Sequence, residues 1–242
     1  MRNLIGAEAF KLAKSLGFKL LLCVNIVSTL IYPILFAVGA KATGYQIMLN
    51  ASVDVLHHGF IGYLYAAVFL CREFSNRTYA ASLLCGYPRW KIFLAKAVVF
   101  LSGLLLLFGV YVGLSTMYGS IANGFGMEVS LKTVWNVFGQ AVCGLAGCAV
   151  MGAVMLLVAA IARRAIVTLG LGIGLTYGFL WLETNFRNHP LPFMKYIYTY
   201  QIGQIGYAGE DFGLGLFWGV MIITFLAALA AAAFLFEKAE LK

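Results

Sequence analysis

Charged side chains are scarce in this sequence. Asp, Glu, Lys and Arg make up 11% of its 242 residues, against about 25% in ordinary soluble domains. Hydrophobic residues make up 62% of the chain, and its mean hydropathy is +0.92. This composition argues against a soluble fold and favours an integral membrane protein.

Cysteine is also sparse, and its pattern predicts neither disulfides nor a metal site. The five cysteines are odd in number and fall in apolar stretches or on the side predicted to be cytoplasmic, so no disulfide framework is indicated. Cys143 and Cys148 have a spacing that fits no common zinc motif. We expect both cysteines to act as small apolar residues that pack between helices.

Motifs for nucleotide binding and catalysis are missing as well. A Walker A motif needs a glycine directly before a lysine that is followed by serine or threonine. Lys14 and Lys132 are followed by serine or threonine, but neither is preceded by glycine. The central parts of the apolar stretches carry no ionisable residue, which is where intramembrane chemistry would show. We therefore expect no catalytic, cofactor-binding or metal-binding residue on this chain, and we expect that it is not an enzyme.

One small group comes nearest to a metal or proton site. Asp54, His57 and His58 cluster near the expected outer end of the second apolar stretch. Two histidines without a third donor make a poor metal site, and paired histidines at an interface need no ligand. A metal or proton site there is the alternative to a plain interfacial role.

Long apolar stretches are what the sequence has in abundance. About 20 apolar residues in a helix span a hydrocarbon core of roughly 30 Å. The sequence predicts an all-α, polytopic fold of one transmembrane domain, 1–242, in which the first stretch is a true helix rather than a cleavable signal peptide. The six predicted spans are 20–40, 55–71, 97–118, 134–162, 165–182 and 212–236.

Positive charge is distributed unevenly between the two ends of these spans. With six spans, 13 of the 17 Lys and Arg residues fall on the side of both termini. They are Arg2, Lys11, Lys14, Lys19, Arg72, Arg77, Arg89, Lys91, Lys96, Arg163, Arg164, Lys238 and Lys242. The positive-inside rule then predicts that both termini are cytoplasmic, and the basic character points to membrane topology and lipid rather than nucleic acid.

Three further segments have recognisable patterns. Residues 1–19 form a predicted amphipathic interfacial helix, with Lys11 and Lys14 opposite an apolar face. The aromatic loop 183–211 suits short segments at the outer interface, where it either gates an exit or caps the bundle. Gly170, Gly174 and Gly178 form a small-residue ladder that predicts close helix packing, within one bundle or between two copies.

The segment between the second and third spans carries more than a linker needs. Glu73 and Arg77 are spaced to pair on a helix surface, and Gly86 suits the C-terminus of that helix. Pro88 suits the first turn of the next one. The sequence predicts a short cytoplasmic helix over 73–85 that exposes aromatic and apolar side chains beside charges.

This layout resembles the permease subunits of ABC type-2 exporters. Glu73, Thr78, Gly86, Arg89, Ile92 and Lys96 are similar to that family's acidic residue, threonine and glycine-x-x-arginine, followed by a lysine-bearing third span. The resemblance implies a partner ATP-binding subunit that holds ATP and Mg²⁺, and a second permease copy or a paralogous permease. It also implies that 73–85 is a coupling helix, for which we expect ATPase contacts from Glu73, Phe74, Arg77, Tyr79 and Leu83.

The size resembles small permeases of bacteriocin-immunity and bacitracin-resistance exporters, which implies efflux of an amphiphilic substrate such as an antimicrobial peptide across the bacterial cytoplasmic membrane. Two other classes stay open. A secondary transporter is expected to place a broken helix or an ionisable residue at mid-membrane. A non-transporting assembly or sensor subunit has no sequence feature against it.

Overall fold

The chain is helical throughout the part that the computed structural model describes, which comprises residues 1–36, 42–71, 86–128, 130–186, 189–205 and 213–238. Its helices are α1 Arg2–Lys14, α2 Leu16–Phe36, α3 Gly44–Ser52, α4 Val55–Ala66, α7 Arg89–Asn123, α8 Leu131–Ala162, α9 Ala165–Asn185, α10 Tyr198–Ile205 and α11 Leu214–Glu237, with a π-helical turn Ala67–Cys71 and a 3₁₀ turn Met194–Tyr196. No β-strand occurs in these residues, so the predicted all-α class is confirmed.

Four helices, α7, α8, α9 and α11, are each long and apolar enough to cross a membrane. Two further candidates are bent pairs rather than single rods: α1 with α2, which meet at 61°, and α3 with α4 and its π-helical turn, which meet at 48°. The described residues therefore hold four to six candidate spans, and the predicted count of six requires each bent pair to be one span.

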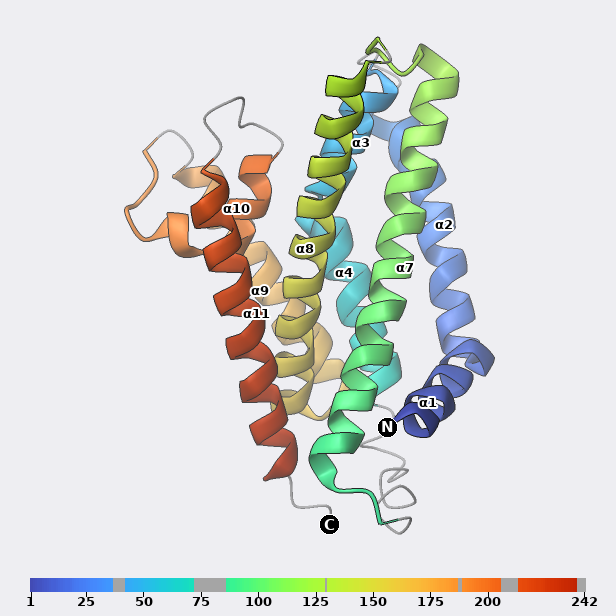
Figure 1. Cartoon of the computed structure of the whole chain (residues 1–242), viewed down its shortest axis with the longest axis vertical. Helices are drawn as coiled ribbons and strands as arrows, with labels where there is room; N and C mark the ends of the chain where they lie inside the picture. The colour runs from blue at the N-terminus through green and yellow to red at the C-terminus, as the bar shows by residue number, and fades with distance from the viewer. Residues whose placement is uncertain (37–41, 72–85, 129, 187–188, 206–212, 239–242) are drawn as a thin grey trace.

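The long helices stand side by side along the length of the molecule (Figure 1). α11 packs along α8, α2 packs along α7, and α4 packs along α9. The core lies where α4, α7 and α8 meet and contains fully buried Tyr65, Phe100 and Met155. α1 lies across the end of the bundle near the N-terminus, whereas α3 and α10 lie toward the opposite end (Figure 1).

Short polar segments explain where several helices begin and end. α3 begins with a capping box between Thr43 and Gln46. The tight connection between α8 and α9 turns through Arg163, whose φ of 52° places it in the left-handed region. Pro88, which was predicted in the first turn of this helix, is instead the N-cap residue just before α7, and proline suits a position whose N–H makes no helical hydrogen bond.

Two predicted boundaries differ from the structure. The N-terminal helix, predicted over 1–19, ends at Lys14 because the extended backbone of Ser15 breaks it before α2. The predicted 55–71 span is preceded by a further helix, α3, which sequence analysis did not predict. In the 183–211 segment, α10 packs against α8, α9 and α11, and so covers part of the bundle end.

Candidate functional site

The predicted coupling residues lie outside the described residues. Glu73, Phe74, Arg77, Tyr79 and Leu83 all fall within 72–85, so their ATPase contacts remain a prediction.

The predicted packing glycines lie on an open face of α9. A Cβ built on Gly170, Gly174 or Gly178 meets no described atom within 4 Å. The glycine of α9 that packs closely inside the chain is Gly172, where a Cβ would overlap the ring of Tyr63 on α4. A packing role for the three predicted glycines therefore concerns contacts beyond this described bundle, such as lipid or a second copy.

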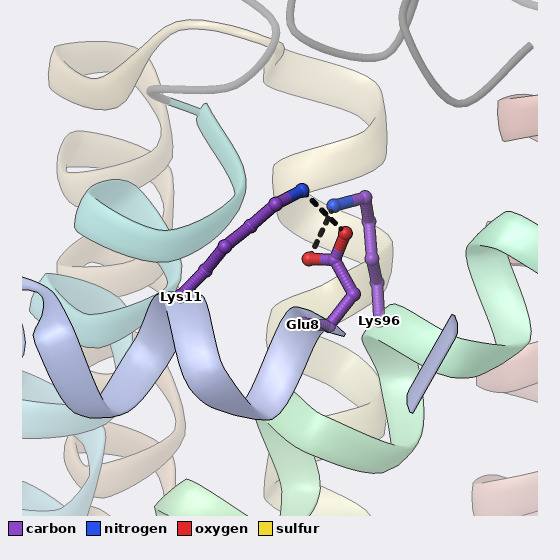
Figure 2. Close-up of polar contacts among 3 residues, drawn as sticks. All are labelled: Glu8, Lys11 and Lys96. Atoms are coloured by element: carbon purple, nitrogen blue, oxygen red, sulfur yellow. Dashed lines mark hydrogen bonds and ion pairs between the residues drawn. The ribbon is translucent and has the colours of Figure 1, made fainter. Parts of the chain in front are cut away.

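A buried ion cluster fastens α1 to α7. The Lys96 Nζ donates to Glu8 Oε2 at 2.7 Å, and Lys11 Nζ donates to Glu8 Oε1 at 2.8 Å. Figure 2 shows the two lysines approaching separate oxygens of the one carboxylate. The side chains of Glu8 and Lys96 are 1% and 2% exposed, whereas Lys11 is half exposed. We call Glu8, Lys11 and Lys96 the Glu8 ion cluster.

The electrostatics of this cluster favour the ionised carboxylate. Burial by itself raises the pKa of Glu8, but the charges of Lys96 and Lys11 and the hydrogen bonds they donate outweigh burial, so the pKa is lowered from its ordinary value. A buried charge is tolerated when it is paired and hydrogen-bonded, and this one is paired on both oxygens.

The face of α1 that meets the bundle is narrow. Leu4, Glu8 and Leu12 are its buried residues and follow the i, i+4 rule for one helix face. Sequence analysis predicted an apolar face opposite Lys11 and Lys14 and placed no carboxylate on it. Glu8 was missed, although it is the one acidic residue among the first 53, and that isolation was the available signal.

A second polar cluster occupies the break between α3 and α4. Asp54 caps α4, since its Oδ1 accepts from the His57 backbone N–H at 3.0 Å, and its Oδ2 accepts from the Tyr111 hydroxyl at 2.8 Å. The ring of His57 stacks on that of Tyr111 at a centroid distance of 3.8 Å. The His57 Nε2 lies 3.0 Å from Asn25 Oδ1 on α2.

His58 completes this group from the inner side of α4. Its Nε2 lies 2.9 Å from the Ala51 carbonyl oxygen, and its ring contacts Phe108 and Tyr111. A cavity of about 10 Å³ separates His57 and His58 from Cys148 on α8, which is room for about one water molecule. We call Asn25, Asp54, His57, His58 and Tyr111 the break cluster.

Helix geometry gives the position of the break cluster along the bundle. Asn25 lies about 14 Å along α2 from Leu16, and its partner Leu107 lies about 17 Å along α7 from Lys96. Those rises are about half of a 30 Å hydrocarbon core. The placement of Asp54, His57 and His58 near the outer end of a span stays a prediction, and α3 extends the chain beyond them.

Neither cluster offers an evident metal site. Within the described part of the chain, no group of three or more His, Cys, Asp or Glu side chains is placed to hold a metal ion. Asp54 already accepts two hydrogen bonds, and His57 and His58 direct their Nε2 atoms to other partners.

A hollow of about 370 Å³ lies between the start of α8 and the loop before it. It is lined mainly by apolar side chains and includes one carboxylate. Its lining residues are Phe125, Glu128, Thr133, Val134, Val137, Phe138 and Ala141. It stands at the end of the bundle opposite α1, because α8 begins at the end where α7 finishes.

Comparison of this chain with protein-family models matches no family, and comparison with curated proteins gives no significant match.

Proposed function

We propose that this chain is the membrane permease subunit of an ATP-driven exporter of the ABC type-2 class. A separate subunit binds ATP and Mg²⁺ and hydrolyses the nucleotide. A second copy of this chain, or a paralogous permease, completes the transporter in the bacterial cytoplasmic membrane, with both termini in the cytoplasm. The exported substrate is an amphiphilic peptide of the antimicrobial kind.

The observation that carries this proposal is a pair of contacts, one on each side of the predicted coupling helix 73–85, which both involve the N-terminal helices α1 and α2. Just before it, Val68 lies against Gly17 at the start of α2. Beyond it, Lys96 of α7 pairs with Glu8 of α1. The unit formed by α1 and α2 thus contacts the chain on both sides of 73–85, and a movement of that segment would be passed to both helices.

The outer surface of the helices supports a membrane setting. Ile166, Leu131 and Ile223 are 85%, 78% and 70% exposed. Large exposed apolar surfaces on a soluble monomer mark interaction sites or liabilities, whereas in lipid they are the expected exterior.

The hollow beside Glu128 supports an amphiphilic substrate. Its mainly apolar lining suits a hydrophobic segment, and the single carboxylate suits a cationic group at the end of such a segment. Antimicrobial peptides combine both properties.

Co-purification tests the pairing with an ATPase. The chain is co-expressed with ATP-binding subunits encoded next to its gene, and the complex is assayed for ATP hydrolysis in lipid. We expect a stable complex whose assembly and activity fall at least tenfold when charge reversal of Glu73 and Arg77 is combined with Phe74→Ala.

The matched control is Lys195→Glu, which changes an exposed charge in the 183–211 segment. It should leave the complex intact. Full assembly and activity in the triple variant would overturn the coupling-helix assignment, and the absence of any ATPase complex would overturn the permease proposal.

A secondary transporter is the second candidate, favoured by one observation. The break between α3 and α4 brings Asp54 and two histidines together within the bundle, and broken helices with ionisable residues are typical of that class. Uptake by proteoliposomes separates the candidates: the exporter requires ATP and its partner subunit, whereas a secondary transporter works with an ion gradient alone.

A further inference from the structure

We propose that the break cluster is a proton-binding site. His57 takes up a proton on its Nδ1, and the change of charge alters the contacts among α2, α4 and α7, which meet at this residue. This inference rests on neither candidate function, because it concerns a property of the chain alone.

Hydrogen bonding fixes the neutral form of His57. Asn25 Nδ2 donates to the Leu107 carbonyl at 2.9 Å, so Asn25 Oδ1 is the atom that faces His57. An amide oxygen only accepts, and the Nε2 of His57 must therefore carry the hydrogen. Nδ1 is left with its lone pair, and a proton taken from water adds there without breaking the bond to Asn25.

The surroundings of His57 are arranged for both charge states. The Asp54 carboxylate lies at the N-terminus of the same helix, where the helix dipole favours negative charge and the Tyr111 hydroxyl holds it. When His57 is protonated, Asp54 compensates its charge and the stacked Tyr111 ring faces a cation. When His57 is neutral, the Tyr111 and backbone bonds keep Asp54 satisfied.

Groups from each neighbouring helix limit what else can exchange the proton. Asp54 and His58 face His57 from the α4 side, Tyr111 faces it from α7, Asn25 from α2, and Cys148 from α8 across the small cavity. The α9 helix places Thr176 against Gly59 rather than a charged group. His57 and Asp54 are half-buried, whereas Asn25 and Tyr111 are fully buried.

His57 lies where three helices meet, so proton binding there can affect how these helices move relative to one another. His57 joins α4 to α2 through Asn25 and to α7 through Tyr111, and Asp54 lies in the two-residue break that separates α3 from α4. A change of charge at this point alters the contacts of three helices at once, which is how ionisable groups in membrane bundles act on conformation.

Nitrogen NMR of the full chain in lipid nanodiscs tests this. The chain has three histidines, and His58→Gln and His189→Gln assign their signals, with exposed His189 as an internal reference. We expect His57 to pass from the Nε2–H tautomer to imidazolium between about pH 8 and about pH 4. Asp54→Asn should lower its midpoint by about one pH unit, a tenfold loss of proton affinity.

Tyr111→Phe keeps the stacked ring and removes one bond to Asp54, so it gives a second measurement should Asp54→Asn fail to fold. A His57 signal that stays in one form over the whole range would overturn the proposal. The proposal would also be overturned if Asp54→Asn and Tyr111→Phe shifted the titration midpoint of His57 no more than they shift that of His189. No ATPase is present in these samples, so failure of the permease proposal leaves the result unaffected.

Discussion

At the scale of single residues, Glu8 and Lys96 decide how α1 is held. Two charges taken out of water gain little net stability from their attraction, but removing one of them takes an opposite charge away from the other, which stays buried. The Glu8–Lys96 pair is almost fully buried, so its loss should be felt far more than that of an exposed pair.

We predict that Glu8→Gln destabilises the protein by about 3 kcal/mol. Denaturant unfolding in mixed micelles, followed by circular dichroism, measures the effect. Lys14→Met is the matched control, because it removes an exposed charge from the same helix, and it should change stability by less than about 0.5 kcal/mol. In the double variant Glu8→Met/Lys96→Met, neither buried charge remains, so the loss should be smaller than the sum of the single losses.

The same carboxylate predicts a pH dependence. The pKa of Glu8 is lowered in the folded protein from its ordinary value of 4.5, so its stabilising contribution is complete above about 4.5 and is lost as the pH falls through the lowered value. Unfolding measured from pH 7 down to about pH 3 should show this loss in the wild type. The loss should be smaller in Glu8→Gln, and identical slopes for the two proteins would contradict the role of Glu8.

At the scale of helices, α9 has one packed face and one open face. Thr168, Gly172 and Thr176 are buried toward α4 and its π-helical turn, and the Thr168 hydroxyl bonds the Cys71 thiol at 3.1 Å. Gly170, Gly174 and Gly178 lie on the other side.

Gly172→Ala should destabilise the bundle by about 1–3 kcal/mol, because the added methyl group overlaps the Tyr63 ring. Gly174→Ala is the matched control: it adds the same atom two residues away in open space and should be neutral or stabilising by up to about 1 kcal/mol through helix propensity. Thermal unfolding in detergent compares the two. Equal effects would show that α9 is not packed on α4 through Gly172.

The open face of α9 gives a separate prediction about assembly. If a second permease copy packs there, Gly174→Leu should lower the dimer fraction in lipid by at least about tenfold, since close approach at a small-xxx-small face needs glycine. Single-molecule photobleaching in nanodiscs measures this fraction. An unchanged fraction would place the contact between copies elsewhere.

The elements differ in how well the sequence predicts them. Uninterrupted apolar stretches identify α7, α8, α9 and α11, and the Arg163–Arg164 pair marks the turn between two of them. α3 has no such signal, because Gln46, Asn50 and Ser52 interrupt it and the segment is too short to span alone. Its helical state depends on a capping box and on packing along α7, which no local pattern reveals.

At the scale of the whole molecule, the charge distribution predicts which end faces the cytoplasm. On a background without native cysteines, Arg164→Cys should react with a membrane-impermeant thiol reagent only after cells are permeabilised, whereas Lys195→Cys should react in intact cells. Mass shifts of the labelled protein give the readout. Labelling of Arg164→Cys in intact cells would reverse the proposed topology.

Long-range contacts are the part of the candidate sites that sequence reasoning could not supply. Lys96 was noticed through a family motif, but its pairing with a residue 88 positions earlier depends on how α1 folds back at Ser15. Asn25 contacts His57 from 32 residues away in the chain, across two different helices. Each half of these contacts is visible in the sequence, whereas the pairing is a property of the fold.

The Glu8–Lys96 contact also has a consequence for the order of events during synthesis. Glu8 leaves the ribosome 88 residues before its partner, which at about 5–20 residues per second is roughly 4 to 18 seconds. During that interval Lys96 of α7 has not yet been made, so the Glu8 carboxylate cannot form this contact. Docking of α1 therefore requires that the chain has been made as far as Lys96, and a nascent chain arrested before Lys96 should leave α1 open to proteases.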